Sequence, residues 1–292
     1  MKKILITGAA SYIGTYVERY LAQWPEAYLV DTIGMVDGNW RTASFQGYDA
    51  VLHVAGLVHQ SKTKEDPAQW AHYKQVNTDL AIETAQKAKA DGVGQFLFLS
   101  SASVYGLTAP LGQTVVITRN TPLNPTDNYG RSKMLAERGL EELETDDFRV
   151  AILRPPMIYG RGCKGNYVTL AKLACKLPLF PKVKNQRSML YMENLANFVK
   201  LLLDDQARGI FCPQNDEYVN TSDMVQKIAQ AHGRHLLLVQ GFTWTLHGLR
   251  HVTAMVDKAF GSLCYDRDLS CYHRDYCVKN LEESILETEG VQ

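Results

Sequence analysis

The feature that most constrains the fold of this chain is the alternation of short apolar runs with amphipathic stretches over its first two thirds. Apolar runs at residues 3–8 (KILITG), 49–56 (DAVLHVAG) and 95–101 (QFLFLSS) have the length of β-strands. Residues 12–23 and 76–92, which lie between them, have the spacing of amphipathic helices. Because strands that helices cover on both faces are continuously apolar, the alternation predicts an α/β fold with an open, doubly wound parallel sheet.

The pattern changes in the last part of the chain. A helix to about residue 143 and a strand at 148–155 continue the alternation, whereas residues 157–166 have the composition of a loop. Helical periodicity follows at residues 167–177, 192–205, 221–233 and 278–290.

This change of pattern suggests two parts. At 292 residues the chain is long enough for one large domain with a smaller companion. We expect a first domain over residues 1–155 and a smaller lobe made mainly of residues 156–292, with part of 187–210 packing back on the first domain.

Charge and hydropathy exclude several classes of partner. The chain has 31 Lys and Arg against 31 Asp and Glu, so no net charge favours nucleic acid or an anionic membrane. No run of about 18 apolar residues is present to insert into a membrane. The start, MKKILITGAASYIG, is too short and too broken at Thr7-Gly8 for a secretory signal, so we expect a first strand there and a cytoplasmic protein.

The cysteines do not suggest a metal site. None of the six forms a CxxC pair, and the spacing of Cys271, His273 and Cys277 matches no common zinc pattern. We therefore expect free thiols in a reducing compartment and no bound metal.

One C-terminal segment is open to two interpretations. Residues 242–263 (FTWTLHGLRHVTAMVDKAFGSL) have the amphipathic character of a membrane-surface helix. Interior glycines and the lack of a lysine-rich face favour instead a helix of the lobe or of a dimer contact. The role of the wider segment 242–277 stays open.

The stretch ITGAASYIG follows the first predicted strand and begins the first predicted helix, which is the context of a dinucleotide-binding turn. Gly8 permits the turn, and Gly14 permits close packing of helix and strand. The helix N-terminus offers N–H groups and a positive dipole end to a pyrophosphate. The alternative is an ordinary glycine-containing βα turn.

Tyr129 and Lys133, in the stretch NYGRSK, stand four residues apart at the start of a predicted helix. Residues at this spacing share one helix face. An ammonium beside a phenol stabilises the phenolate, lowering its pKa from about 10 toward the range in which it exchanges protons with an alcohol. The alternative is a solvated helix face.

These motifs together resemble those of the extended short-chain dehydrogenase/reductases, the group that contains the sugar-nucleotide epimerases. T-G-x-x-x-x-x-G resembles the fingerprint T-G-x-x-G-x-x-G, with Ser11 in place of the middle glycine. HVAGLVH resembles H-x-A-G, VNTDLAIETA resembles the helix that carries a structural asparagine, and LSSASVYG resembles S-S-x-x-V-Y-G. The order of these motifs between residues 7 and 133 is that of the family.

The resemblance implies a Rossmann-type NAD(P)-binding domain and a substrate-binding lobe. It also implies a catalytic set in which Tyr129 takes a proton from a sugar hydroxyl, Lys133 holds the phenolate and bonds the nicotinamide ribose, and Ser101 bonds the reacting oxygen. The residues assigned to the cofactor are Gly8, Ser11, Tyr12, Ile13, Gly14, Asp31, Asp37, Ala55, Gly56, Asn77, Tyr129 and Lys133.

Two acids near the second predicted strand bear on cofactor choice. Asp31, at the expected end of the strand AYLVDTIG, is placed to accept hydrogen bonds from the adenosine ribose and to repel a 2′-phosphate, which favours NAD and leaves NADP possible. The alternative is that Asp31 only begins a loop. Asp37 resembles the acid that contacts adenine in the family.

The resemblance extends to the substrate lobe. ILRPPMIYGRG and NQRSMLYMENLANFV resemble the segments that meet the nucleotide-sugar, which implies that Arg187 pairs with the substrate diphosphate. A surface charge is the alternative for Arg187. Asn166 and Tyr167 are predicted to contact the sugar or the nucleobase, and a homodimer is implied by the resemblance.

The motifs leave two enzymatic hypotheses. Related 4,6-dehydratases carry Asp-Glu after the catalytic hydroxyl residue, and Ala102 and Ser103 stand there in this chain, which argues against dehydration. A nucleotide-sugar 4-epimerase that keeps its NAD is one hypothesis, and a reductase of 4-keto-sugar nucleotides that exchanges NAD(P)H is the other. A non-catalytic dinucleotide-sensing protein is a third, disfavoured because Ser101, Tyr129 and Lys133 are all present.

Overall fold

The computed structural model describes residues 1–58, 67–241 and 255–291. It consists of two compact units. Unit 1 comprises Met1–Gly106, Pro122–Pro155 and Leu195–Pro213, and unit 2 comprises Leu107–Thr121, Pro156–Asn194 and Gln214–Gln292. The chain changes unit between Pro155 and Pro156, where the predicted boundary lay, but residues 107–121 belong to unit 2 and not to the predicted first domain.

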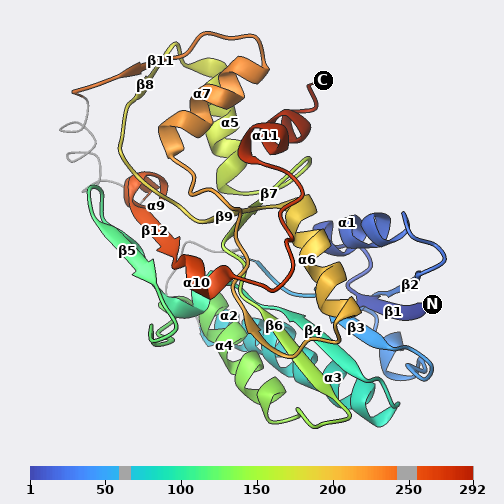
Figure 1. Cartoon of the computed structure of the whole chain (residues 1–292). Helices are drawn as coiled ribbons and strands as arrows, with labels where there is room; N and C mark the ends of the chain where they lie inside the picture. Colours follow the sequence, from blue (N-terminus) through green and yellow to red (C-terminus); the bar gives the residue numbers. More distant parts are fainter. Residues whose placement is uncertain (59–66, 242–254, 292) are drawn as a thin grey trace. The chain divides into compact units, whose positions relative to one another are not determined.

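Unit 1 is built on a six-stranded parallel sheet with the order β10-β6-β4-β3-β1-β2 (Figure 1). Two neighbours of β1, namely β2 and β3, extend the sheet in opposite directions, so the fold is doubly wound and the predicted α/β class is confirmed. The strands are β1 (Lys2–Thr7), β2 (Tyr28–Ile33), β3 (Ala50–His53), β4 (Gln95–Leu99), β6 (Arg149–Leu153) and β10 (Gly209–Phe211).

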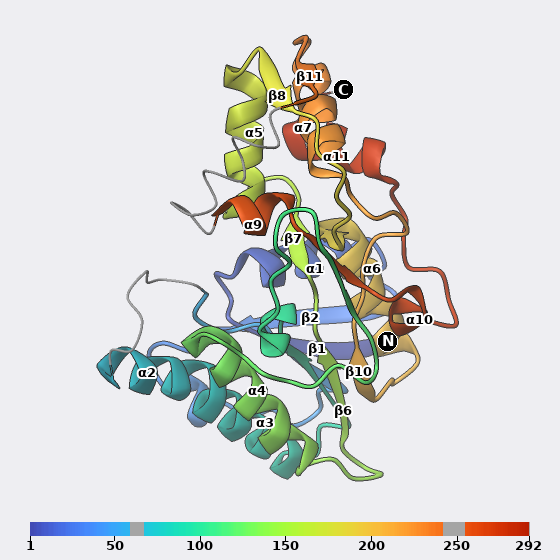
Figure 2. The same ribbon diagram turned by 90° about the vertical axis from the view of Figure 1, so that its left-hand side faces the viewer.

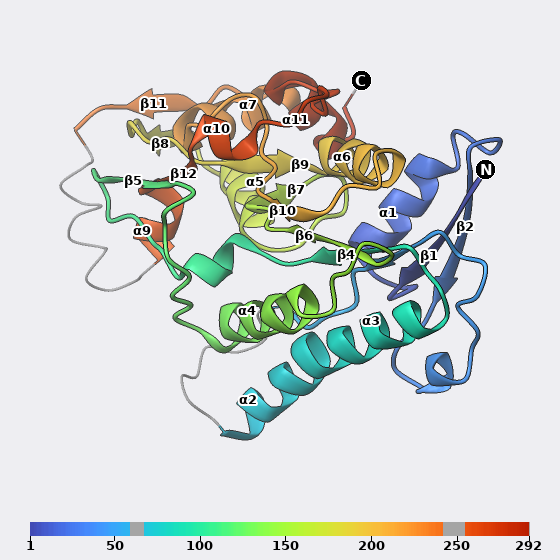
Figure 3. The same ribbon diagram turned by 60° about the horizontal axis from the view of Figure 1, so that its bottom comes forward.

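Helices cover both faces of this sheet. In Figure 3, α1 and α6 lie on one face and α2, α3 and α4 lie on the other. The central strands β3 and β4 are almost wholly buried because both of their faces are covered, which explains their continuous apolar sequence. The helices are α1 (Tyr12–Leu21), α2 (Pro67–Tyr73), α3 (Leu80–Ala90), α4 (Asn128–Glu141) and α6 (Met192–Asp204), of which α6 enters unit 1 at Leu195.

Unit 2 has its own apolar core, in which α7 lies between α5 and α11 (Figure 2). Its two-stranded parallel sheets pair β7 with β9, β8 with β11 and β5 with β12. The elements are β5 (Thr114–Ile117), β7 (Met157–Tyr159), α5 (Asn166–Lys176), β8 (Leu179–Pro181), β9 (Met189–Tyr191), α7 (Thr221–Ala231), β11 (Leu237–Val239), α9 (Met255–Phe260), β12 (Ser262–Tyr265), α10 (Arg267–Ser270) and α11 (Leu281–Glu289).

Two details of unit 2 differ from the sequence-based expectation, and both have a non-local cause. Residues 157–166 were expected to be a loop, but Met157–Tyr159 forms β7 because it pairs with β9, about thirty residues away along the chain. Residues 107–121 join unit 2 because β5 pairs with β12, whose residues lie near the C-terminus. Such short strands carry no periodicity of their own.

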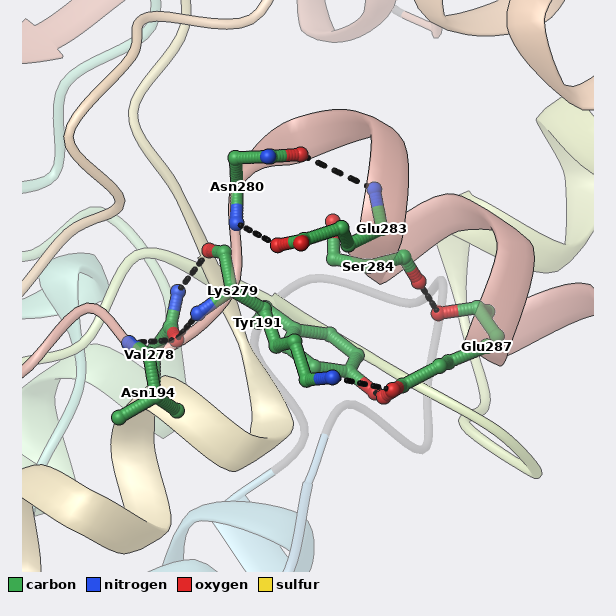
Figure 4. A network of polar contacts seen from close by, with 9 residues as sticks. Tyr191, Asn194, Val278, Lys279, Asn280, Glu283, Ser284 and Glu287 are labelled. Atoms are coloured by element: carbon green, nitrogen blue, oxygen red, sulfur yellow. Dashed lines mark hydrogen bonds and ion pairs between the residues drawn. The ribbon is translucent and has the colours of Figure 1, made fainter.

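The last helix of unit 2 is held by a network of polar contacts (Figure 4). The fully buried Asn194 accepts hydrogen bonds from the backbone N–H groups of Val278 (2.9 Å) and Lys279 (3.0 Å) and donates to the Lys279 carbonyl (3.0 Å). Asn280 and Glu283 form a reciprocal capping box at the start of α11. The C-terminal segment of unit 2 is therefore attached by specific hydrogen bonds as well as by apolar packing.

Within the described ranges, no helix combines the length and the apolar composition needed to cross a membrane. The segment 242–263 was open to two interpretations, a membrane-surface helix or a helix of the lobe or of a dimer contact. Residues 242–254 of this segment lie outside the described residues.

Candidate active site

The predicted phosphate loop begins where β1 ends. Gly8 has φ of +87°, a conformation that glycine adopts without the strain a side chain would meet. A Cβ added to Gly8 would lie 3.1 Å from the backbone nitrogen and Cα of Ala55. The loop after β1 therefore packs closely against the segment after β3, as a turn that cradles a dinucleotide requires.

Ser11, in place of the family's middle glycine, is the N-cap of α1. Its φ of −76° and ψ of 142° are an extended conformation open to any residue, and its hydroxyl accepts a hydrogen bond from the Gly14 N–H at 3.0 Å. Tyr12 and Ile13 form the first helical residues. A Cβ on Gly14 would lie 2.6 Å from the Ser11 hydroxyl, so Gly14 is required for space.

The two acids assigned to the adenosine are both engaged with neighbouring side chains. Asp31 is the fourth of the six residues of β2, opposite Leu5, and accepts a hydrogen bond from the Tyr48 hydroxyl at 2.8 Å. It therefore lies within the strand, two residues before its end, and not at the end as expected. Asp37 lies in the following loop and accepts hydrogen bonds from the backbone and side chain of Asn39.

Ser101 and Tyr129 meet at the carboxyl end of β4. Ser101 caps the 3-10 helix Ala102–Tyr105, and a hydrogen bond joins its side chain to that of Tyr129. Asp127 caps α4 by accepting from the Gly130 N–H at 2.7 Å. A Cβ on Gly130 would clash with the backbone of Ser103, so this glycine lets the start of α4 approach the segment that follows Ser101.

Lys133 lies one turn after Tyr129 and is only 4% exposed, which rules out a solvated helix face at this position. Its Nζ donates a hydrogen bond to the Leu99 carbonyl (2.8 Å) and lies 4.5 Å from the ring centre of Phe98. Burial lowers the pKa of Lys133 to about 8, so the ammonium form still prevails at neutral pH.

The expected lowering of the Tyr129 pKa is wrong for the chain by itself. Burial raises the pKa of Tyr129 to about 12, and this effect outweighs the lowering by the hydrogen bond with Ser101. The Lys133 ammonium is directed to the Leu99 carbonyl. Tyr129 is therefore a phenol at neutral pH, and further positive charge at the site is needed to make it a base.

The residues of the H-x-A-G and asparagine motifs lie around Lys133. A Cβ on Gly56 would lie 3.0 Å from the Asn77 Oδ1 and 3.4 Å from the Lys133 Nζ. Asn77 is fully buried, in a π-helical stretch Lys74–Asp79, and binds both backbone groups of Leu57 and the Ser132 hydroxyl. Irregular helical turns of this type are frequent at functional sites.

Two of the three predicted substrate residues of unit 2 line one pocket. Asn166 and Arg187 lie in its wall among apolar side chains such as Met157, Met189 and Met224. Arg187 donates to the Gly261 carbonyl (2.9 Å), and burial lowers the pKa of its guanidinium. Among the described residues, no carboxylate forms an ion pair with it, so the pocket wall carries a cation without a protein counter-charge.

The assignment of Tyr167 to the substrate needs correction. Its side chain is 2% exposed and belongs to the core of unit 2, where it stacks on Tyr159 with ring centres 5.3 Å apart. Its hydroxyl donates to Glu289 at 2.6 Å. The residue follows Asn166 on α5 by one position and so points about 100° away around the helix.

Sequence reasoning missed polar residues that surround the catalytic set. Ser132 bonds the Tyr129 carbonyl (2.8 Å) and accepts from Asn77. Glu137 is 1% exposed and pairs with Arg154. The spacing of Glu137 could have indicated this role, because it follows Lys133 by four residues and so lies on the same helix face as Tyr129 and Lys133. A charged residue on a buried face requires a partner.

Comparisons with known proteins show the family of the chain. The model of the "NAD dependent epimerase/dehydratase family" matches residues 4–211. A UDP-glucose 4-epimerase of Vibrio cholerae is 30% identical over 253 residues, 79% of this chain and 76% of the relative. A GDP-6-deoxy-D-mannose reductase of Pseudomonas aeruginosa is 29% identical over 178 residues, 57% of this chain and 56% of the relative.

A similar fold occurs in a solved structure. The UDP-glucuronic acid 4-epimerase of Bacillus cereus, in complex with NAD, superposes with a TM-score of 0.73, at 16% identity and over 99% of this chain and 97% of that one.

Proposed function

The chain belongs to the NAD dependent epimerase/dehydratase family, and on that premise we propose that it is a nucleotide-sugar 4-epimerase. Its substrate is a UDP-hexose or a UDP-N-acetylhexosamine, its NAD stays tightly bound, and it serves the synthesis of surface-polysaccharide precursors. The observation that carries the proposed chemistry is the hydrogen bond between Ser101 and Tyr129 at the carboxyl end of β4, with the buried Lys133 one turn along α4. The 30% identity to a UDP-glucose 4-epimerase over 79% of this chain favours epimerisation over reduction.

The residues around the first βα turn fit a dinucleotide. At Gly8 and Gly14 a Cβ would fill the space beside the loop, and the first turn of α1 presents backbone N–H groups to a pyrophosphate. We assign the cofactor to this turn, to Ala55 and Gly56 after β3, and to Lys133. Bound NAD would supply a hydride acceptor and a positive charge on its nicotinamide ring.

The chain's own groups hold and move the proton. Ser101 holds the reacting sugar oxygen, and Tyr129 takes the proton from the C4 hydroxyl and later returns it. With the dinucleotide bound, the positive charge of the nicotinamide ring would add to that of the Lys133 ammonium in favouring the phenolate form of Tyr129 in that step. Inversion at C4 requires that the keto sugar present its other face before hydride would be returned to C4 and the proton to its oxygen.

Arg187 provides the substrate contact that we propose for unit 2. A half-buried guanidinium without a carboxylate partner among the described residues is suited to a diphosphate, which it binds through two parallel hydrogen bonds. Asn166, in the same pocket wall, is a second candidate contact.

Arg187→Ala should weaken binding of UDP-sugar and of UDP by about 10–100-fold, the size of one or two charge-assisted hydrogen bonds. Calorimetric titration with UDP measures the change. Arg234→Ala is the matched control because Arg234 is an exposed arginine of the same unit. The affinity of this variant for UDP should equal that of the unaltered chain. Equal affinity in the Arg187 variant would remove Arg187 from the substrate site.

The ribose contact of Asp31 stays a prediction. Asp31→Ala should raise the affinity for NADP relative to NAD by about tenfold, because the carboxylate repels a 2′-phosphate. Tyr48→Phe removes the hydrogen bond to Asp31 but leaves the charge of the Asp31 carboxylate. The preference of this variant between NAD and NADP should therefore be unchanged. If Asp37→Ala alters the ratio of dissociation constants and Asp31→Ala does not, the ribose acid is Asp37.

A 4-keto-sugar reductase is the second candidate, favoured by the resemblance to the GDP-6-deoxy-D-mannose reductase. It would use the same Ser101, Tyr129 and Lys133. Dehydration is disfavoured because Ala102 and Ser103 provide no carboxylate after Ser101. A homodimer also stays a prediction.

The nucleotide content of the purified protein separates the two candidates. We expect protein prepared without added cofactor to release a near-stoichiometric amount of NAD on heat denaturation, identified by chromatography. Protein that is isolated free of dinucleotide, and that oxidises NADPH in proportion to an added 4-keto-sugar nucleotide, would overturn the epimerase proposal.

A further inference from the structure

Two consecutive turns of α4 hold two consecutive residues at the end of β4. Lys133 donates to the carbonyl of Leu99, and Glu137, four residues later, accepts a hydrogen bond from the hydroxyl of Ser100. Ser101 follows directly in the chain. These two hydrogen bonds fix the position of α4 relative to the end of β4. They lie next to Ser101 and Tyr129, whose side chains must meet.

Glu137 is itself held by a buried arginine. Arg154, which follows β6, donates from Nε to the Glu137 carboxylate (3.1 Å and 3.2 Å) and from Nη2 (2.7 Å). Its Nη1 donates to the Tyr105 hydroxyl at 3.0 Å. Glu137 is 1% and Arg154 is 7% exposed, so this ion pair is shielded from solvent and its charges act over longer distances than surface charges do.

The charged and titratable groups around Lys133 come from several elements. From β3, the fully buried His53 is neutral, since burial lowers its pKa to about 3. Tyr129, on the same helix face, is a phenol at neutral pH. Glu137 is the carboxylate whose charge favours the ammonium form of Lys133, against the effect of burial.

We propose that Glu137 is a positioning residue of the active site, which holds α4 against the end of β4 and keeps Lys133 in its ammonium form. The consequence for catalysis rests on the proposed function, whereas the effect on Lys133 is a property of the chain alone. Arg154 orients the Glu137 carboxylate, and Tyr105 orients the guanidinium.

Glu137→Gln separates the charge from the shape of this side chain. The amide keeps the size of the carboxylate and its capacity to accept from Ser100, but it removes the negative charge that favours the ammonium form of Lys133. The pKa of Lys133 should therefore fall from about 8 by about one further unit. Because the ammonium is lost at lower pH, the alkaline limb of kcat should move down by the same amount.

The test is a titration of the full chain labelled with 13C at lysine Cε, followed by NMR without substrate. Lys133→Arg identifies the signal by its loss. Glu142→Gln is the matched control, since Glu142 is an exposed glutamate that caps the end of α4, and the pKa of Lys133 in this variant should be unchanged. An unchanged Lys133 pKa in Glu137→Gln overturns the proposal.

A second variant covers the case in which Glu137→Gln does not fold. Glu137→Gln with Arg154→Met leaves no unpaired buried charge. The pKa of Lys133 should still fall in this variant, because Glu137 is the carboxylate that favours its ammonium form. A Lys133 pKa equal to that of the unaltered chain overturns the proposal here too. Since no substrate is used, absence of epimerase activity would contradict the proposed function without affecting this result.

Discussion

Tyr129→Phe should lower turnover of the nucleotide sugar by a factor on the order of 10²–10⁴, because it removes the group that carries the proton. The affinity for the dinucleotide should stay nearly the same, since the ring is retained. Initial rates at saturating substrate measure the first quantity, and fluorescence titration with NAD measures the second.

Tyr272→Phe is the control for this substitution, because Tyr272 belongs to unit 2 and is assigned no part in the chemistry. Its turnover should equal that of the unaltered chain. Full turnover in the Tyr129 variant would exclude Tyr129 as the proton carrier.

Arg154→Ala should have the largest effect on stability. It leaves the Glu137 carboxylate buried without its partner, and breaking a buried ion pair in this way costs about 3–5 kcal/mol. The midpoint of urea unfolding, read by circular dichroism, should fall accordingly.

Two further variants show whether the loss comes from the unpaired charge. Arg149→Ala, at the start of β6, removes an arginine whose contacts to Gln206 are exposed, and should cost less than about 0.5 kcal/mol. Arg154→Met combined with Glu137→Leu replaces both charges by apolar groups and should recover most of the stability. If Arg154→Ala and Arg149→Ala unfold at the same midpoint, the ion pair contributes little.

The fold of unit 1 was predictable because its information is local. The strands β1, β3, β4 and β6 are short apolar runs, and the helices α1, α3 and α4 between them have their own periodicity. The short sheets of unit 2 were not predictable in the same way. β7 has three residues and β12 four, and each exists because it pairs with a segment distant in the chain.

The catalytic set was also accessible from the sequence, since Ser101, Tyr129 and Lys133 belong to ordered motifs. What the motifs could not give was the environment of these groups. The raised pKa of Tyr129 depends on burial, which spacing does not reveal.

The same limit applies to two residues outside the catalytic set. Tyr167 is a core residue although it neighbours Asn166 in sequence. Asp31 lies within β2 because the strand continues to Ile33, which pairs with Thr7 of β1. This register is defined only by the pairing of the two strands in the sheet.

Proton NMR of the purified protein with UDP-glucose, UDP-galactose and their N-acetyl forms, with no cofactor added, tests the central claim most directly. We expect inversion at C4 of one sugar pair, catalysed by the unaltered chain and lost in Tyr129→Phe. Absence of inversion for all four sugars, even after addition of NAD, would contradict the proposal that this chain is a UDP-hexose or UDP-N-acetylhexosamine 4-epimerase.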